Sequence, residues 1–473
     1  MTTNIFKIML LLILLPYVIL PDIVLAEQDE DIYFYLYKSN IPNVSTKMLF
    51  PDFWINNTNN PKNLLYNEND IVAYNRSNIE NCPVVVDLEY YKEYFSKAEI
   101  VNMISAVSKP SKNKRYDANG RQYTPKDYDK LNNNLNFNFL DEINKIIYGF
   151  SVRRTEMRTY PTYERLFSSP DSTEYDRFME TAVYLAEPLI ILSISKDQQW
   201  YFAQMYNYRA WIPVKDVAIA EKKEFMQFIK SKPFLIVTDK NIYTNYNPAN
   251  EKVSEIKVDM GVKLPLAFQD EINDYTGAQS TSGNFVVKLP TRDKAGKLVI
   301  YMALIPITKD VHVGYLPYTI ENIIKQSFKL QGERYGWGGT HNGRDCSSFL
   351  MDIFRTMGIK LPRNSSEQGK LASGIYYEMS EDMTLDERET ILDKLDIGAG
   401  LFMSGHAMLY LGKYHNTYYA IHDFSGFHKK KQNGQFDYYS VLEVAVAPLS
   451  IYTSKESTFL EALYGARLFY LNR

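Results

Sequence analysis

The sequence is poor in the residues on which several protein classes depend. It has only two cysteines, Cys82 and Cys346, and six scattered histidines among 473 residues, and it has no Cys-x-x-Cys or His-Glu-x-x-His spacing. Zinc fingers and zinc peptidases are therefore excluded, and we expect no metal ion and no other cofactor. With 22 glycines and 20 prolines, the chain also lacks the composition of collagen or of a low-complexity linker.

Neither sign of charge is in excess. Lys and Arg number 53 and Asp and Glu number 56, so the formal net charge is −3 at pH 7. This balance gives no overall electrostatic attraction to nucleic acid or to an anionic membrane, and we expect no nucleic-acid partner. Hydrophobic residues make up 45% and charged residues 23% of the chain, which is the composition of a protein that folds around a large core. The length predicts about three domains.

The longest apolar run stands near the N-terminus, where it covers residues 8–20. It contains Pro16 and is too short to cross a hydrocarbon core of about 30 Å. Val24 and Ala26 then occupy the −3 and −1 positions of a cleavage site. We expect residues 1–26 to be a signal peptide. The mature protein is then exported to the periplasm or the cell exterior without a stable membrane anchor, and a retained anchor is the alternative.

Four stretches follow, distinguished by their hydrophobic patterns. Residues 27–147 combine Asn-rich segments with helical periodicity and predict a mostly helical unit. Residues 148–222 and 230–319 contain short apolar runs separated by turn residues, which predicts two small β-barrels in tandem. In residues 320–473 helical patterns come first and strands later, the order of an α+β domain. We therefore expect a multidomain protein with this layout.

The densest motif is GERYGWGGTHNGRDCSSFLMDIFRTMG, at residues 332–358. Its glycines permit tight turns before Cys346, and the apolar residues after Cys346 recur at helical spacing until Gly358. Cys346 is thus expected to begin a buried helix, whose positive N-terminal end would lower the pKa of the thiol and make thiolate available near neutral pH. A lone buried cysteine is ordinarily a core residue, and a disulfide with Cys82 is a further alternative, but the glycine-rich approach favours a nucleophile.

A thiol nucleophile needs a base, and the base needs an orienting partner. The segment LFMSGHAMLYLGKYHNTYYAIHDF predicts a β-hairpin that carries both. If its turn is centred on Tyr414, His406 lies directly opposite His422, with Cβ atoms about 4.5–5.5 Å apart. His422 can then fix the orientation and the tautomer of His406. His415 in the turn and His428 farther along the second strand are weaker partners.

Residues 332–425 resemble the catalytic domain of the NlpC-type, papain-like cell-wall cysteine peptidases. The resemblance rests on YGWGG, on DCSS with its cysteine, on LPRNSSEQ and on the strand pair with the two histidines. It implies a triad of Cys346, His406 and His422 in a papain-like C-terminal domain. The wider layout is similar to that of family members that cut murein peptides, with a helical unit and two bacterial Src-homology-3-like barrels before the peptidase, and RRTEMRTYPT in the first barrel is a further match.

The resemblance implies hydrolysis of the γ-D-glutamyl to diamino-acid bond in peptidoglycan stem peptides, through an acyl-enzyme. Cys346 would attack the amide carbonyl and His406 would protonate the leaving amine. The backbone N–H of Cys346 and the hydroxyl of Tyr335 would stabilise the oxyanion. The resemblance also places a set of residues around the stem peptide, where a carboxylate and hydroxyls could hold a free L-Ala amine: Trp337, Asp345, Ser347 and Ser365, with Tyr208 and Trp211 from the first barrel.

Simpler interpretations stand beside these assignments. Asp345 is equally well placed to cap the helix that begins after it, and Tyr208 and Trp211 are typical of packing in a barrel. Ser348 and Ala210 stand where the family more often has glycine. The chain as a whole could be a wall-peptide binding protein, or an exported amidase or acyltransferase that uses the same three residues. We expect a monomer whose partners are peptidoglycan stem peptides or murein fragments.

Overall fold

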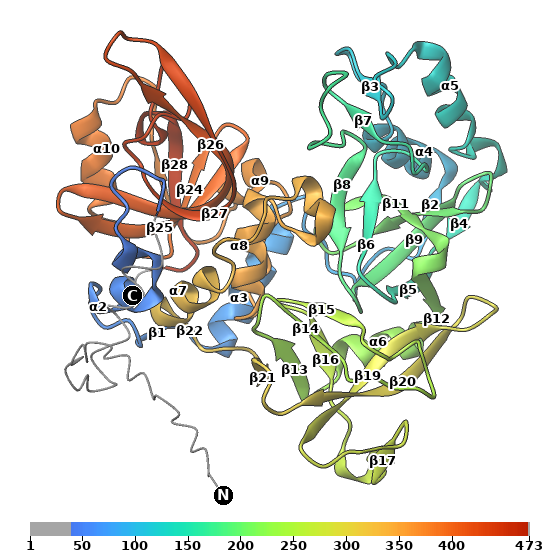
Figure 1. The fold of residues 1–473 in the computed structure, drawn as a ribbon. Helices are drawn as coiled ribbons and strands as arrows, with labels where there is room; N and C mark the ends of the chain where they lie inside the picture. The colour runs from blue at the N-terminus through green and yellow to red at the C-terminus, as the bar shows by residue number, and fades with distance from the viewer. Residues whose placement is uncertain (1–38, 472–473) are drawn as a thin grey trace, which may run out of the picture.

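The computed structural model describes residues 39–471, so the predicted signal peptide lies outside the described residues. The N-terminal segment covers residues 39–146, the first β-unit 147–220, the second β-unit 234–319 and the C-terminal unit 320–471. In Figure 1 the C-terminal unit lies at the left, the first β-unit at the right and the second β-unit below them. Among the described residues, no helix combines the length and the apolar character needed to span a membrane.

The N-terminal segment contains short helices and single strands. Its helices are η1 (Thr46–Leu49), α2 (Pro51–Asn56), α3 (Glu68–Asn81), α4 (Lys97–Val107), α5 (Pro125–Asn133) and η2 (Phe137–Phe139). Its strands are β1 (Leu64–Tyr66), β2 (Tyr94–Ser96), β3 (Tyr116–Asp117) and β4 (Ile143–Lys145). Capping boxes built on Asn67 and Ser96 begin the two longest helices, α3 and α4. β1 pairs with β22 (Tyr318–Thr319), the strand that directly precedes the C-terminal unit, and β3 pairs with β7 (Leu166–Phe167) of the first β-unit.

The first β-unit is a seven-stranded antiparallel sheet in the order β12-β5-β9-β10-β11-β6-β8. Its strands are β5 (Ile147–Ser151), β6 (Thr155–Arg158), β8 (Met179–Val183), β9 (Pro188–Ile194), β10 (Trp200–Gln204), β11 (Arg209–Pro213) and β12 (Val217–Ala220), with η3 (Val214–Asp216) before the last. Large aromatic side chains fill its interior, among them Phe202 and Trp211, which are fully buried. The loop at residues 168–178 leads from β7 into β8, the strand nearest the C-terminal unit.

The second β-unit follows the helix α6 (Lys222–Lys230). Its strands are β13 (Phe234–Val237), β14 (Asn241–Tyr243), β15 (Lys257–Asp259), β16 (Lys263–Pro265), β17 (Tyr275–Thr276), β18 (Gln279–Ser280), β19 (Asn284–Arg292), β20 (Leu298–Pro306) and β21 (Val311–Val313), with η4 (Gln269–Glu271) between β16 and β17. They form small antiparallel sheets, of which β16-β13-β21 is three-stranded and β19-β20 is the longest hairpin. Leu235, Val237 and Ile305 belong to a hydrophobic cluster that is separate from the largest core.

The C-terminal unit has helices before strands, in the order expected from the sequence. Its helices are α7 (Ile320–Phe328), η5 (Trp337–Asn342), α8 (Cys346–Arg355), α9 (Ser365–Gly369), α10 (Leu385–Leu392) and α11 (Phe459–Ala462). Its strands, in the sheet order β23-β28-β24-β25-β26-β27, are β23 (Ile375–Glu378), β28 (Leu463–Leu468), β24 (Gly400–Met403), β25 (His406–Tyr414), β26 (Thr417–Lys430) and β27 (Phe436–Pro448). Because α8 packs against β25 and β26, it is buried along nearly its whole length.

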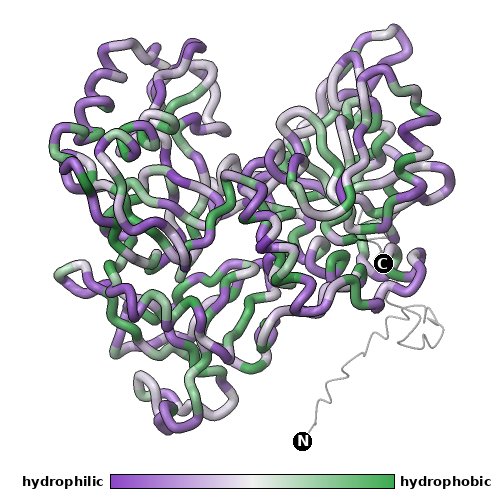
Figure 2. Tube along the Cα trace, turned by 180° about the vertical axis from the view of Figure 1, so that it is seen from behind, coloured by the Kyte–Doolittle hydropathy of each residue, from purple (hydrophilic) through white to green (hydrophobic). Residues whose placement is uncertain are grey.

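Hydrophobic positions follow the strands and central helices of each unit. Viewed from behind, the hydrophilic stretches follow the outer loops and the exposed helices (Figure 2). Aromatic packing also crosses between units, because Tyr66 of β1 lies 6.1 Å from Tyr318 and 6.3 Å from Tyr470, measured between ring centroids. The N-terminal segment is thus packed against the C-terminal unit rather than separated from it by a linker.

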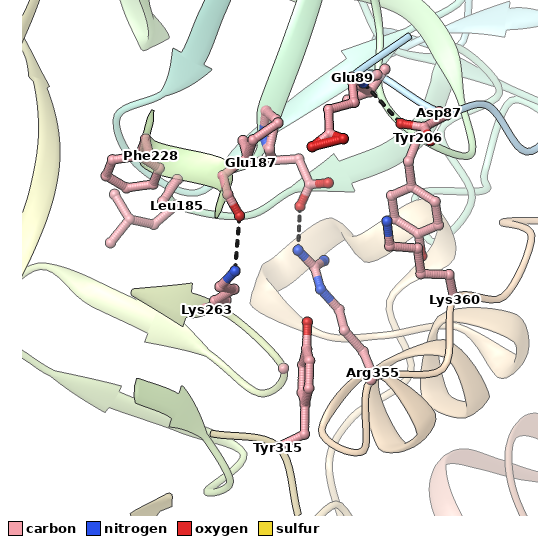
Figure 3. Close-up of a pocket in the computed structure, with 16 residues that line it drawn as sticks. Asp87, Glu89, Leu185, Glu187, Tyr206, Phe228, Lys263, Tyr315, Arg355 and Lys360 are labelled. Carbon is pink, nitrogen blue, oxygen red and sulfur yellow. Dashed lines mark hydrogen bonds and ion pairs between the residues drawn. The ribbon is translucent and has the colours of Figure 1, made fainter. Parts of the chain in front are cut away.

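A cavity of about 320 Å³ lies where the N-terminal segment, both β-units and the C-terminal unit meet. Within it, Arg355 donates to the Glu187 carboxylate of the first β-unit at 2.5 Å, and Lys263 donates to the Ile229 carbonyl at 2.9 Å (Figure 3). Arg355 ends α8, about 14 Å along the helix from Cys346 at its start. The cavity therefore marks the junction of the units and lies at the opposite end of α8 from the cysteine.

Candidate active site

Cys346 is the first residue of α8, and a glycine-rich turn leads to it. In η5, Gly338 and Gly339 have φ values of 63° and 98°, in the left-handed region that favours glycine. Strand β8 of the first β-unit packs so closely here that a Cβ on Gly339 would lie 2.5 Å from the Cβ of Ala182. Glycine is thus needed for the turn and for the approach of the first β-unit. The predicted helix start at Cys346 is confirmed.

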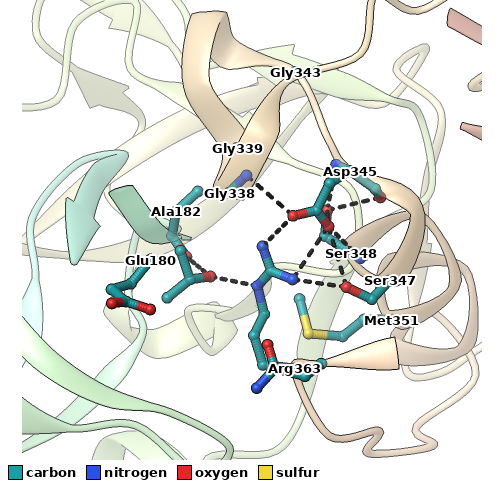
Figure 4. A network of polar contacts seen from close by, with 12 residues as sticks. Glu180, Ala182, Gly338, Gly339, Gly343, Asp345, Ser347, Ser348, Met351 and Arg363 are labelled. Carbon is teal, nitrogen blue, oxygen red and sulfur yellow. Dashed lines mark hydrogen bonds and ion pairs between the residues drawn. The ribbon is translucent and has the colours of Figure 1, made fainter. Parts of the chain in front are cut away.

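Asp345 caps α8 and is enclosed by donors (Figure 4). Its Oδ1 accepts from the Ser348 N–H at 3.0 Å, and its Oδ2 accepts from the Gly338 N–H at 3.0 Å. The Arg363 guanidinium donates to both carboxylate oxygens, at 3.1 and 2.6 Å. Burial opposes ionisation, but the Arg363 charge and these hydrogen bonds hold the pKa of Asp345 below its ordinary value. The capping role is confirmed, and a substrate amine would have to share oxygens that protein donors already occupy.

Burial dominates the electrostatics of the Cys346 thiol. Burial and the neighbouring Asp345 carboxylate raise the pKa of the thiol to about 12, while a backbone hydrogen bond from Ala407 acts in the opposite direction. The expected lowering by the helix N-terminus is therefore wrong, because desolvation and a nearby negative charge outweigh the positive end of the helix. Cys346 is a protonated thiol at neutral pH and needs a base. Cys82 is also free, so no disulfide joins the two cysteines.

His406 and His422 form a directly bonded pair. His406 Nε2 lies 2.8 Å from His422 Nδ1, and the two ring planes are inclined by 62°. His406 begins β25 and immediately precedes Ala407, whose backbone N–H bonds to the Cys346 thiol. The two histidines singled out by the hairpin pattern are therefore together, next to the cysteine. The Nδ1 atom of His406 remains free of protein hydrogen bonds within the described chain.

The hairpin that carries the histidines differs from the predicted one. Its turn lies at residues 415–416, with φ values of 45° and 60°, and is not centred on Tyr414. A bulge at residue 411 then shifts the register of the two strands. Extending that register makes His406 and His422 diagonal neighbours rather than directly opposed residues. Their rings still meet, because diagonal positions are within reach of long aromatic side chains.

Burial lowers the pKa of both histidines. The pKa of His406 falls to about 4 despite the opposing Asp345 charge, and the pKa of His422 falls well below its ordinary value. Both rings are therefore neutral at pH 7. For His406 Nδ1 to accept a proton, its own proton must reside on Nε2, which then donates to His422 Nδ1. The His422 ring is held by stacking on Phe424, with centroids 4.0 Å apart, and by edge-to-face packing against Phe459 at 5.1 Å.

Tyr335 and Trp337 lie on the glycine-rich side of the site. Burial raises the pKa of Tyr335, and the charges of Asp345 and of a Cys346 thiolate act in the same direction, which places Tyr335 close to both. Its hydroxyl has no protein hydrogen-bond partner among residues 39–471. Trp337 is partly exposed, and its ring lies edge-on to Tyr175 of the first β-unit at 5.7 Å. Both side chains therefore lie on the glycine-rich side of the cysteine, next to the loop that carries Tyr175.

Ser347 and Ser365 occupy different positions relative to the cap. Ser347 donates to Asp345 Oδ1 at 3.2 Å and accepts from Arg363 Nη1 at 2.8 Å, so it belongs to the network that encloses Asp345. Ser365 is the first residue of α9, which packs against α8 and β25. It is partly exposed and lies on the elements next to the cysteine and the histidines, without a side-chain bond to any of them.

The two predicted residues of the first β-unit have different environments. The Tyr208 hydroxyl donates to the Glu180 carboxylate, which also accepts from Thr159 Oγ1 at 2.5 Å. Within the described chain no lysine or arginine lies at ion-pair distance from Glu180, and in Figure 4 its carboxylate points away from the Asp345 network. Trp211 is fully buried and donates from Nε1 to Ser108 Oγ at 3.0 Å. Its assignment as a substrate contact is wrong, because the β11 position points into the core.

Arg363, which bonds Asp345, and Glu180, which bonds Tyr208, are residues that the sequence reasoning missed. Arg363 stands inside LPRNSSEQ, so the motif was visible, but only the fold shows that its guanidinium reaches Asp345 and donates from Nε to Thr181 Oγ1 at 2.7 Å. Glu180 lies in an ordinary alternating strand, β8, and no local pattern distinguishes it from a solvent-facing carboxylate.

Comparison with known families agrees with this geometry. Residues 332–436 match the NlpC/P60 family, and residues 165–213 match the SH3 domain of the SH3b1 type. The chain thus contains an NlpC/P60 domain with its papain-like fold, preceded by an SH3 domain, and the resemblance found in the sequence is confirmed. The cysteine and both histidines lie inside the matched C-terminal range.

Several known proteins are similar over part or most of the chain. A gamma-D-glutamyl-L-lysine dipeptidyl-peptidase of Bacillus cereus is 26% identical over 207 residues, which are 44% of this chain and 54% of that protein. The chain thus spans about half the length of this relative. The Bacillus subtilis protein of the same name is 38% identical over 58 residues, 12% of this chain and 20% of that one. An NlpC/P60 endopeptidase structure from Photobacterium damselae subsp. piscicida has a TM-score of 0.69 at 17% identity, covering 88% of this chain and 96% of that one, and it shows the same fold.

Proposed function

We propose that the protein is an exported cysteine peptidase that hydrolyses the γ-D-glutamyl to diamino-acid bond of peptidoglycan stem peptides. The observation that carries this proposal is the placement of Cys346, at the start of α8, next to the bonded pair of His406 and His422. The NlpC/P60 domain supports the class of enzyme. The name of the Bacillus relatives supports the choice of bond.

In the proposed reaction the proton moves as the new bond forms, because the unliganded site pairs a thiol with a neutral imidazole. His406 Nδ1 takes the thiol proton while Cys346 Sγ attacks the carbonyl carbon, and His422 Nδ1 accepts from the resulting imidazolium. Collapse of the tetrahedral intermediate breaks the C–N bond, and His406 gives its proton to the departing amine. Water then attacks the thioester with His406 as base, which releases the γ-carboxylate and restores the thiol.

Two donors are available for the oxyanion. The backbone N–H of Cys346 lies in the first turn of α8, where an amide has no acceptor within the helix. The Tyr335 hydroxyl borders the same sulfur and has no protein acceptor among the described residues. Donors fixed in this way act on charge that develops only in the transition state, and the buried setting strengthens them.

We place the amine end of the stem peptide at Glu180. Among residues 39–471 its carboxylate is bonded only to the hydroxyls of Tyr208 and Thr159, so a substrate ammonium group would supply the cation that these residues do not. The neighbouring network of Asp345 and Ser347 forms the adjoining wall, and Trp337 and Ser365 stay substrate contacts in this proposal. A free L-Ala amine would then select released stem peptides over peptides still attached to sugar.

The same proposal covers the organisation of the chain. We propose that the second β-unit, at 230–319, is a further SH3-like barrel beside the one at 148–222, and that 27–147 is a mostly helical unit. The proposed cell-wall substrate is consistent with export by a signal peptide at 1–26 and with a monomer that acts outside the cytoplasm. Soluble murein fragments are the proposed partners.

Two other functions would use the same fold. A wall-peptide binding protein would not need a bonded histidine pair next to a buried thiol, and the intact pair therefore favours catalysis. An exported amidase or acyltransferase would use the same three residues. An amidase releases the whole peptide from the sugar, and a transferase joins the acyl group to a second amine, so the products distinguish these reactions.

Mass spectrometry of muropeptides after digestion tests the proposal. The wild-type protein should produce fragments that end in D-Glu together with fragments whose diamino residue has a new free amine. Cys346→Ser should form neither product while keeping the far-UV dichroism of the wild type, and Cys82→Ala, the matched cysteine control, should stay active. Release of intact stem peptides would indicate an amidase, and saturable binding without any product would indicate a binding protein.

A further inference from the structure

The loop at residues 168–178 of the first β-unit lies over the glycine-rich side of the site. Glu174 accepts two hydrogen bonds from Arg334 Nη2, at 2.8 and 2.9 Å, which joins the loop to the C-terminal unit. The Tyr175 ring lies edge-on to Tyr335, with centroids 6.0 Å apart, and to Trp337 at 5.7 Å. The loop is therefore anchored against the two aromatic residues that border Cys346.

Arg177 projects its guanidinium onto the same aromatic surface. The guanidinium carbon lies 4.8 Å from the centroid of the Trp337 ring and 5.6 Å from that of Tyr175. Its Nε donates to Ser168 Oγ at 3.0 Å. An arginine has five N–H donors, so four of them are left after this bond. Within residues 39–471 no carboxylate lies at ion-pair distance from Arg177.

A second cation stands near Arg177 without a neutralising acid. Burial and the positive charge of Arg115, from the N-terminal segment, lower the pKa of Arg177. Arg115 also forms no ion pair among the described residues, and its Nε is buried without a partner. Two partly buried guanidinium groups that repel each other are unfavourable unless an anion joins them. Both come from segments outside the C-terminal unit, and Arg177 lies on Trp337 of that unit.

We propose that Arg177 binds a carboxylate of the substrate and so makes the enzyme selective for acidic stem peptides. This inference rests on the proposed peptidase function. A γ-glutamyl linkage leaves the α-carboxylate of the D-Glu residue free, and the diamino residue brings a carboxylate of its own, or two in diaminopimelate. Either source offers the planar pair of oxygens that a guanidinium binds with two parallel hydrogen bonds. The aromatic rings of Trp337 and Tyr175 hold that guanidinium in place.

Steady-state kinetics with three synthetic peptides test the inference and identify the carboxylate. The peptides are L-Ala-γ-D-Glu-L-Lys, the same peptide with its α-carboxylate amidated, and L-Ala-γ-D-Glu-meso-diaminopimelate. Arg177→Gln in the full-length protein should raise KM about tenfold for the peptide whose carboxylate is bound, with kcat within about twofold of wild type. Arg177→Lys, which keeps the charge, should recover part of this loss.

The ratios between peptides identify the source of the carboxylate. If Arg177 binds the α-carboxylate, the wild type prefers the free over the amidated peptide and Arg177→Gln loses that preference. If it binds the diamino residue, the preference for diaminopimelate over lysine is the one that disappears. Arg153→Gln is the matched control, because Arg153 is an exposed arginine that pairs with Asp216 of its own unit at 3.1 Å, and its loss should leave all ratios unchanged.

Two results would overturn the inference. Equal peptide ratios in wild type and Arg177→Gln, at equal melting temperature, would show that Arg177 only packs on Trp337. Cleavage of none of the three peptides by the wild type would remove the proposed peptidase function and this inference with it. The two failures are distinct, since only the second abolishes turnover by the unmodified protein.

Discussion

The two β-units flank the same C-terminal unit, yet only the first reaches the active site. From the first β-unit, Thr181 accepts from Arg363, and Arg154 Nη2 donates to the carbonyls of Gly339 and Gly343 at 3.1 and 2.8 Å. Tyr184 donates to Asp352 of α8 at 2.6 Å. These contacts reach the cap, the glycine-rich turn and the helix that carries the cysteine. The first β-unit therefore contacts the surroundings of Cys346 directly.

The second β-unit contacts the same machinery through intermediates. Its Asp259, which is fully buried, accepts from Arg154 at 2.7 Å, and the Lys240 carbonyl accepts from Arg344 Nη2 at 3.0 Å. Arg344 in turn donates to Asp352 at 2.6 Å. The bonds from the second β-unit therefore end on Arg154 and Arg344, which in turn bond the glycine-rich turn and α8. The second β-unit therefore holds Arg154 and Arg344 in position, whereas the first β-unit contacts the surroundings of Cys346 itself.

This difference shows that two β-units of similar size can take unlike roles because of what their edges face. Strand β8 packs directly against the glycine-rich turn that leads to Cys346, so a substitution there should change which substrates bind. The buried carboxylate of the second β-unit meets only protein, so a substitution there should change stability first. The following predictions separate these two kinds of effect.

The largest effect is expected where the first β-unit, the cap and the helix meet. Arg363→Met would leave the Asp345 carboxylate buried without its counter-charge, which costs about 3–5 kcal/mol for a buried pair. We expect a correspondingly lower unfolding midpoint in urea and loss of detectable hydrolysis. Arg292→Met is the control, because its guanidinium only donates to the Val217 carbonyl between the β-units, and it should cost about 1 kcal/mol or less. Similar losses in both variants would contradict the proposed difference.

The C-terminal unit should also respond to pH through its histidines. The folded-state pKa of His406 is about 4, below the ordinary value of about 6.5, so the unfolded chain takes up a proton first as the pH falls. The contribution of neutral His406 to the free energy of unfolding is therefore fully present above pH 6.5, and it is lost as the pH falls toward 4. Between pH 7.5 and 5, wild type should lose about 2 kcal/mol more stability than His406→Gln.

Urea unfolding at the two pH values measures this difference. His312→Gln in the second β-unit provides the control, since His312 lies outside the site and bonds only to the Gly314 carbonyl, at 3.1 Å. Parallel pH dependences for wild type and His406→Gln would show that the buried histidine pair does not contribute to acid sensitivity.

A smaller effect is expected from the buried carboxylate of the second β-unit. In Asp259→Asn the amide oxygen can still accept from Arg154, but the guanidinium loses its counter-charge, at a cost of about 1–2 kcal/mol. Arg154 keeps its bonds to the glycine-rich turn, so kcat/KM should fall by less than about tenfold. Calorimetry and kinetics on the same preparation check both values. Complete loss of hydrolysis at unchanged stability would place the second β-unit in the cleft.

The smallest change, and the one confined to substrate selection, concerns Glu180. Glu180→Gln should slow hydrolysis of L-Ala-γ-D-Glu-diamino-acid about tenfold, because a charge-assisted hydrogen bond to the free amine is lost. Wild type should likewise cut the N-acetylated peptide about tenfold more slowly than the free one, and the variant should not distinguish them. Side-by-side kinetics test this, and equal wild-type rates on both peptides would move the role from fragment recycling to cutting of intact wall.

Local patterns were sufficient for much of the site. The glycine-rich turn, the helix that begins at Cys346 and the strand pair with His406 and His422 all follow from spacing and turn chemistry over a few residues. The register of that hairpin could not be predicted in this way, because one bulge at residue 411 shifts every pair of facing residues beyond it. The Trp211 assignment failed for a related reason, since strand periodicity shows that a side chain alternates but not which face is the core.

Chain pattern alone therefore predicted the helix that begins at Cys346, the strand pair with the two histidines and the order of units along the protein. The protonation of the site was decided by tertiary structure, because desolvation of Cys346 and His406 depends on everything packed around them and reversed the effect expected from the helix terminus. The contacts between the units were decided in the same way. Only the packing of β8 against the glycine-rich turn brings Thr181 to Arg363, and only the fold lays Arg177 over Trp337.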